Sequence, residues 1–146
     1  SDHEDVISGT VTLVKTDDNV NTEDRIPLAG AEFVVQKTEE GKTVYAIFNT
    51  NNKNTLEDWT EKIDEATVLT TNNEGKITVN GLAPDTKYEF KETKAPEGYS
   101  INETNVTVTW FATNGYNSKD RPAKKSNIII KVVIGFFFIR ALLVVV

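Results

Sequence analysis

The sequence predicts an all-β fold, a β-sandwich of seven to eight strands. Short runs of the chain alternate between apolar and polar residues and are rich in β-branched side chains, as antiparallel strands with one buried face require. Gly, Pro and Asn residues separate these runs at short intervals. This spacing favours a sandwich over alternating strands and helices. With 146 residues, the chain fits one domain that buries a sizeable core.

The alternating runs give the positions of the expected strands, which are 7–15, 31–36, 43–48, 66–71, 76–79, 86–92, 105–110 and 127–134. Asn73 and Gly75 predict a tight turn, and Asn80 with Gly81 predicts a second one. A short helical insert is allowed over 56–63, with Thr55 as its cap.

These positions divide the chain into a flexible segment (1–6), the sandwich domain (7–134) and an apolar tail (135–146). The tail admits three interpretations: a strand covered by a partner, a membrane-proximal segment, or a wrongly assigned sequence. The apolar stretch from Ile128 is broken by Lys131 and Arg140, which makes a membrane helix costly. We therefore expect no membrane contact for the folded domain.

Composition excludes several classes of function. The net charge of -6 argues against nucleic acid as a partner, because phosphate binding needs a clustered positive face. Without cysteine, neither disulfides nor thiolate metal sites can form. The single histidine, His3, lies in the polar N-terminal stretch, which argues against a Ser-His-Asp triad. The acidic residues over 17–23 are interpreted as a solvated loop, so no cofactor and no metal are expected.

Two ionisable residues fall on faces that should be buried. Lys15 shares its strand face with Val11 and Leu13, because side chains alternate with a period of two. Glu92 likewise follows Tyr88 and Phe90. The alternative is a surface interpretation, in which the lysine reaches water at a strand end and the glutamate pairs with a neighbouring surface lysine.

Three stretches resemble the B-type, prealbumin-like immunoglobulin fold of Gram-positive collagen adhesins and SpaA-like pilins. They are VTLVKTD (11–17), PLAGAEFVVQ (27–36) and GKITVNGLAPDTKYEFKETKAPEGY (75–99). The last contains YEFKETKAPEGY, which is similar to the E-box of that family. VYAIF, Trp59 and ATVLTTNNEGK are similar to the major shaft pilins in particular, and the resemblance covers roughly 8–110.

The resemblance implies a CnaB-type sandwich with a self-made isopeptide bond. In that family a lysine that ends the first strand bonds to an asparagine on the last strand, assisted by the E-box glutamate. The lysine falls on Lys15 and the glutamate on Glu92. The asparagine falls on Asn127, with Asn117 as second choice. If 127–134 runs parallel to the first strand, however, Lys15 lies opposite Ile134, where the family would carry the asparagine.

The chemistry of such a bond needs an uncharged amine. Burial disfavours the ammonium form and so makes Lys15 nucleophilic. A buried, protonated Glu92 can polarise the carboxamide and shuttle a proton to the leaving ammonia. The reaction would occur once per chain, so it is maturation and not enzymatic turnover.

The leading functional hypothesis is a structural module of a pilus or adhesin on the surface or cell wall of a Gram-positive bacterium. Its expected partners are other pilin subunits or domains of the same surface protein. A second hypothesis is a ligand-binding adhesin domain, which would contact a host matrix protein through the polar segment 49–65 and exposed aromatic residues. The least favoured hypothesis is a hydrolase that uses Glu92 with a second carboxylate such as Glu97.

Overall fold

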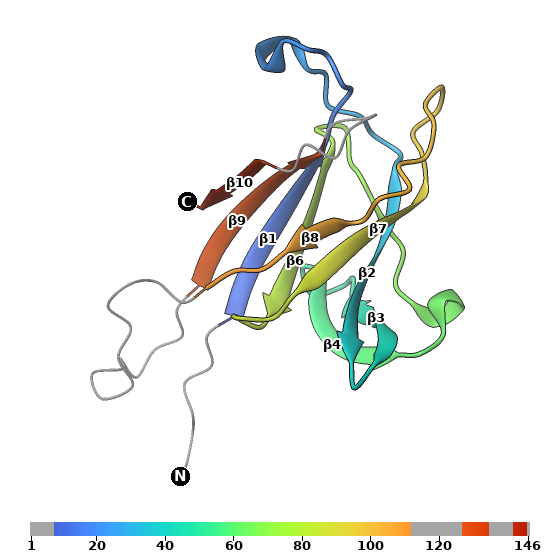
Figure 1. Cartoon of the computed structure of the whole chain (residues 1–146), viewed down its shortest axis with the longest axis vertical. Coiled ribbons are helices and arrows are strands. Elements are labelled where there is room, and N and C mark those ends of the chain that lie inside the picture. Colours follow the sequence, from blue (N-terminus) through green and yellow to red (C-terminus); the bar gives the residue numbers. More distant parts are fainter. Residues whose placement is uncertain (1–7, 112–126, 135–141, 146) are drawn as a thin grey trace, which may run out of the picture.

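The computed structural model describes residues 8–111, 127–134 and 142–145, which form ten strands and two short 3-10 helices (Figure 1). The strands are β1 (Ser8–Lys15), β2 (Glu32–Glu39), β3 (Lys42–Asn49), β4 (Thr55–Thr60), β5 (Leu69–Thr70), β6 (Lys76–Leu82), β7 (Tyr88–Lys94), β8 (Val106–Val108), β9 (Asn127–Ile134) and β10 (Leu142–Val145). The 3-10 helices are η1 (Thr22–Asp24) and η2 (Ile63–Glu65). The all-β prediction is confirmed, and every expected strand has a counterpart.

The strands form one curled sheet in the order β10-β9-β1-β6-β4-β3-β2-β7-β8, with β5 attached to β2. The connection between β6 and β4 is a single bridge, Thr55 to Asn80. Strands β9, β1 and β6 therefore make one layer, and β3, β2, β7 and β8 make the layer that faces it (Figure 1). This arrangement is the predicted sandwich.

The first strand lies between its two neighbours in the register that the sequence predicts. Strand β1 pairs antiparallel with β6 and parallel with β9, and Lys15 lies opposite Ile134. At the other end of the same ladder, Ser8 lies opposite Asn127. In Figure 1, β1 and β9 run side by side over their whole length.

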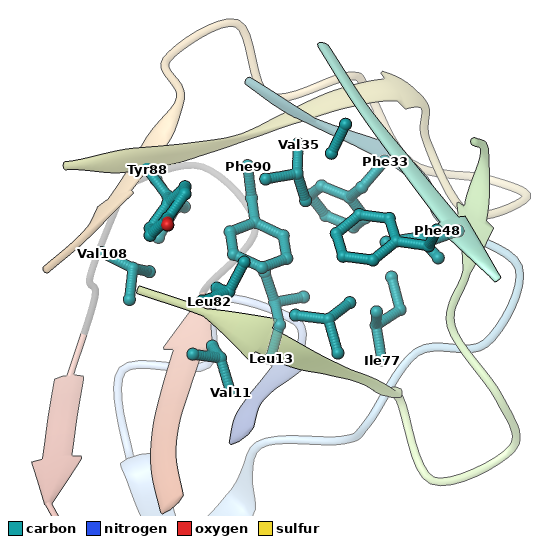
Figure 2. Close-up of a cluster of buried hydrophobic side chains, with 14 of the residues drawn as sticks. Val11, Leu13, Phe33, Val35, Phe48, Ile77, Leu82, Tyr88, Phe90 and Val108 are labelled. Atoms are coloured by element: carbon teal, nitrogen blue, oxygen red, sulfur yellow. The ribbon is translucent and has the colours of Figure 1, made fainter. Parts of the chain in front are cut away.

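The hydrophobic core fills the space between the two layers. Val11 and Leu13 of β1 point toward Phe90 of β7 and Val35 of β2 (Figure 2). Buried apolar side chains of this kind each contribute about 1.5–3 kcal/mol relative to an exposed position. The core thus comes from the alternating positions that the sequence pattern selected.

Two local predictions are wrong. Residues 56–63 do not form a helix: β4 occupies 55–60 and pairs antiparallel with β3, and η2 follows it. Pairing with β3 and packing of Trp59 on the core outweigh the weak local helix signal.

The second wrong prediction is the turn at Asn80 and Gly81, because both residues lie inside β6. Gly81 has a φ of 87° and sits where the register between β1 and β6 shifts. An Asn-Gly pair is typical of turns, but here the glycine makes a β-bulge.

The apolar tail is described in part. Residues 142–145 form β10, which pairs antiparallel with β9. Within the described ranges, none of the helical segments is long and apolar enough to cross a membrane.

Candidate functional site: a buried lysine and carboxyl pair

The backbone of Lys15 is fixed where β1 ends. Its N–H donates to the carbonyl of Gly75 at 2.8 Å, and its carbonyl accepts from the N–H of Leu28 at 2.8 Å. Gly75 has a φ of 72°, and a Cβ atom added there would lie 2.6 Å from the Lys15 carbonyl oxygen. The turn that the sequence predicts at this glycine therefore holds the end of β1 in place.

The side chains of Lys15 and Glu92 meet inside the sandwich. Lys15 Nζ lies 3.5 Å from Glu92 Oε1, and the two side chains are 0% and 1% exposed. They are the two charged residues that are buried among those whose burial is described. The predicted burial of both residues is what the structure shows, and the surface interpretation of them is wrong.

The surroundings of the pair explain its electrostatics. Burial lowers the pKa of Lys15 below its ordinary value of 10.5, and the neighbouring Glu92 carboxyl only partly opposes that shift. A larger fraction of the amine is therefore uncharged than at a solvated lysine. An uncharged amine has the lone pair that a nucleophile needs.

The second carboxyl oxygen of Glu92 has its own partner. Oε2 accepts a hydrogen bond of 2.8 Å from the backbone N–H of Asn102, in the segment that joins β7 to β8. The carboxyl group is thus held between Lys15 on one oxygen and Asn102 on the other. Sequence reasoning did not find Asn102, because a backbone N–H carries no residue signature and the contact depends on the path of a loop.

Of the two asparagines predicted as acceptors, the structure describes Asn127, and it does not bring this residue to Lys15. Asn127 begins β9 opposite Ser8, and it lies seven residues, about 23 Å at about 3.3 Å per residue, from Ile134. Asn117 lies outside the described residues.

The two tryptophans have structural roles. Trp110 is buried, and its Nε1 donates to the carbonyl of Leu82 at 3.1 Å. Trp59 stacks on Tyr88 with ring centroids 6.0 Å apart. Glu97 is exposed whereas Glu92 is buried, so this pair of carboxyls does not share a cleft as a glycosidase requires.

A polar groove lies apart from the buried pair. It has a volume of about 710 Å³ and runs between the β5 and β6 region and the turn from β3 to β4. Lys53 and Lys76 line it together with threonine and asparagine side chains. Thr50, Lys53 and Asn54 belong to the segment that the adhesin hypothesis singled out.

The comparisons with known proteins agree with this architecture. The family model described as the SpaA prealbumin-like fold domain matches residues 9–121. Among solved structures, the group B streptococcus pilus 2b backbone protein is 28% identical, with a TM-score of 0.52, and the match covers 87% of this chain and 41% of that one.

Two further structures show the same fold at lower identity. The minor pilin GBS52 of Streptococcus agalactiae is 24% identical, with a TM-score of 0.55, over 88% of this chain and 45% of the other. The shaft pilin SpaA of Lactobacillus rhamnosus GG is 22% identical, with a TM-score of 0.56, over 90% and 47%. This chain thus spans less than half the length of each of these pilins. The comparison with curated proteins found no match.

Fold and site together define a prealbumin-like β-sandwich that buries a lysine and a carboxyl group beside the end of its first strand. The match over 9–121 covers most of the chain. The chain belongs to the SpaA prealbumin-like fold domain family.

Proposed function

We propose that this protein is a structural module of a pilus or adhesin on the surface or cell wall of a Gram-positive bacterium, and that it staples itself with an isopeptide bond from Lys15. The observation that carries the proposal is the buried pair, with Lys15 Nζ 3.5 Å from Glu92 Oε1. The pilin structures with the same fold support the setting, in which other pilin subunits are the partners.

The proposed reaction joins the Lys15 amine to the carboxamide of an asparagine. The lone pair of Nζ attacks the amide carbon, while Glu92 donates a proton to the carbonyl oxygen. Glu92 then carries one proton from the amine to the departing nitrogen, which leaves as ammonia. As the C=O bond re-forms, the carbonyl oxygen returns its proton to Glu92. Glu92 ends in its starting state, and one C–N bond has replaced another.

The fold supplies the acceleration and the single turnover. Holding amine and amide in contact is equivalent to effective molarities on the order of 10⁵ M or more. The new amide bond is part of the product and remains in the core, so the site cannot react a second time. The proposed role is therefore mechanical and not enzymatic, because a covalent bond would share tension with the hydrogen-bond ladders.

Intact-mass measurement tests the cross-link. Loss of ammonia lowers the mass by about 17 Da relative to the sequence. The wild-type protein is expected to show this deficit, and a Lys15→Met variant is expected to have its full calculated mass. A wild-type protein with its full mass would contradict the cross-link and leave the family assignment standing.

A second candidate function is ligand binding in the polar groove, as in an adhesin domain that recognises a host matrix protein. The groove favours it because Lys53 lines that surface and is exposed. A Lys53→Glu variant should lose binding to immobilised matrix proteins, whereas Lys42→Glu, at the exposed first residue of β3, should retain it. Equal binding by both variants would exclude the groove.

A further inference from the structure

The polar groove is a hollow of about 710 Å³ in which every charged lining residue is a lysine. These lysines are Lys53 and Lys76, whereas the chain as a whole has a net charge of -6. Apolar residues complete the lining together with threonines and asparagines, and they are Val68, Leu69 and Ile77. Such a surface attracts a negatively charged partner that also offers an apolar side chain.

The wall that carries Lys53 is already fixed by the fold. The Asn54 side chain donates to the carbonyl of Thr78 at 2.9 Å, and the N–H of Asn80 donates to the carbonyl of Asn54 at 2.9 Å. The Asn80 side chain in turn donates to the carbonyl of Lys53 at 2.7 Å. Because these bonds tie the turn between β3 and β4 to the edge of β6, a partner spends little free energy on ordering this wall.

The two lysines differ in what they can offer to a partner. Lys76 Nζ lies 3.0 Å from Glu74 Oε2 and is therefore engaged within its own strand end. Lys53 is exposed, and it forms no ion pair with a carboxylate of the described residues. Lys53 is thus the cation that a negatively charged partner would pair with.

A loop of opposite charge projects from the end of the sandwich at which Lys15 lies. This acidic loop consists of residues 17–26, includes η1, and extends in blue beyond the strand ends in Figure 1. It carries four carboxylates and one guanidinium. Its shape is held by its own hydrogen bonds, since the N–H of Ile26 donates to Asp17 Oδ1 and Asn21 Nδ2 donates to Asp24 Oδ2, both at 3.1 Å.

The acidic loop also presents apolar side chains to solvent. Val20 is 88% exposed and Ile26 is 59% exposed, although the loop around them is ordered. Two exposed apolar side chains on one ordered, charged loop are typical of a contact surface. Within its own chain the loop leaves the groove open, because no residue of 17–26 lines it.

We propose that the acidic loop of one copy of this protein docks in the polar groove of a second copy. Val20 enters the apolar part of the groove beside Val68, and the exposed carboxylate of Glu23 faces Lys53. A hollow of this volume admits a few side chains of a loop and not a folded domain. The inference rests on the proposed function, in which pilin subunits are the partners, and it names two surfaces that bring them together without a covalent bond.

This contact joins copies in a head-to-tail row. The loop and the groove are different surfaces of the same chain, so each docked pair keeps one unused loop and one unused groove. A heterologous contact of this kind continues into a filament unless its rotation closes a ring. One loop in one groove buries a small area, so the association in solution is weak and depends on protein concentration.

Sedimentation equilibrium of two variants and their mixture tests the docking. The average mass of the wild-type protein should rise above the 16.2 kDa of one chain as its concentration approaches about 1 mM. Lys53→Glu, which has no competent groove, and Val20→Lys, which has no competent loop, should each stay at the mass of one chain. Their equimolar mixture should reach twice that mass and grow no further, because the loop of the first variant fits the groove of the second.

Lys42→Glu and Ile63→Lys are the matched controls. They make the same changes of charge at exposed positions outside both surfaces, so they should associate as the wild-type protein does. Association lost equally in these controls would show that the net charge and not the loop and groove governs it, and would overturn the inference.

A wild-type protein or a mixture of the two variants that keeps the mass of one chain at every concentration would also overturn the docking. If such a monomeric protein binds matrix proteins through Lys53, the groove belongs to a foreign partner. Intact mass measured on the same samples reports the cross-link separately. A deficit of about 17 Da in a protein that does not associate would therefore leave the proposed cross-link standing.

Discussion

Replacing Glu92 with Gln tests the proposed chemistry with a nearly isosteric change. The variant keeps the volume of the buried side chain, but it has no carboxyl group to shuttle a proton between Lys15 and the leaving nitrogen. The cross-link should therefore fail to form, and the amine should stay buried and unreacted. Glu89→Gln is the matched control, because it removes the same charge from β7 at a half-buried position on the other side of the strand.

The magnitude follows from the size of the covalent loop. A cross-link that closes a loop of about 100 residues stabilises a protein by about 4.7 kcal/mol through the entropy of the unfolded chain. At about 4 °C per kcal/mol for a domain of this size, the loss corresponds to about 15–20 °C in Tm. Burial of an unreacted amine adds to the loss.

Thermal unfolding followed by circular dichroism, with intact mass measured on the same samples, is the assay. Glu92→Gln should unfold about 15–20 °C below the wild-type protein and have its full mass, whereas Glu89→Gln should match the wild-type protein in mass and lie within about 3 °C of it in Tm. If the two variants unfold together and both lack about 17 Da, Glu92 has no part in the reaction.

Three further predictions concern the supports of the site. Gly75→Ala should lower the free energy of unfolding in urea by at least about 1 kcal/mol more than Gly30→Ala does. Both glycines have positive φ, but only at Gly75 would the added Cβ atom lie 2.6 Å from the Lys15 carbonyl oxygen. Equal losses would argue against that contact. Trp59→Ala should lower the free energy of unfolding by about 2–3 kcal/mol, because it removes the stack on Tyr88. Glu57→Ala, at an exposed position of the same strand, should change it by almost nothing. Similar losses in the two variants would contradict the packing of β4. In Glu92→Gln, the free energy of unfolding should rise relative to Lys15→Met/Glu92→Gln as the pH increases toward 10.5. Burial lowers the pKa of Lys15 in the folded state, so the unfolded state binds more protons in the range just below 10.5. A difference that is flat or falls with pH would show that the amine is not desolvated.

The sequence predicts the buried pair because strands impose a strict alternation of side chains. Lys15 and Glu92 each follow two apolar residues at spacings of two, and both are buried as the parity requires. The parallel register of β1 and β9 was also predictable, since the family resemblance supplied the direction and simple counting placed Ile134 opposite Lys15.

The missed features depend on contacts between distant parts of the chain. Strand β4 carries Glu57 and Asp58 and a helix-like cap, so its pairing with β3 overrides what its local sequence favours. At Gly81, a turn and a bulge call for the same glycine conformation, and only the neighbouring strand distinguishes them. The contact of Asn102 with Glu92 is made by a backbone N–H, which every residue type except proline offers.

A high-resolution crystal structure measures the separation of Lys15 Nζ from its acceptor most directly. A covalent amide predicts continuous electron density from Nζ to a side-chain carbonyl carbon, with a C–N distance of about 1.33 Å and a planar group. An amine separated from every carboxamide carbon by about 3 Å or more would contradict the central claim that this sandwich closes itself with a covalent bond.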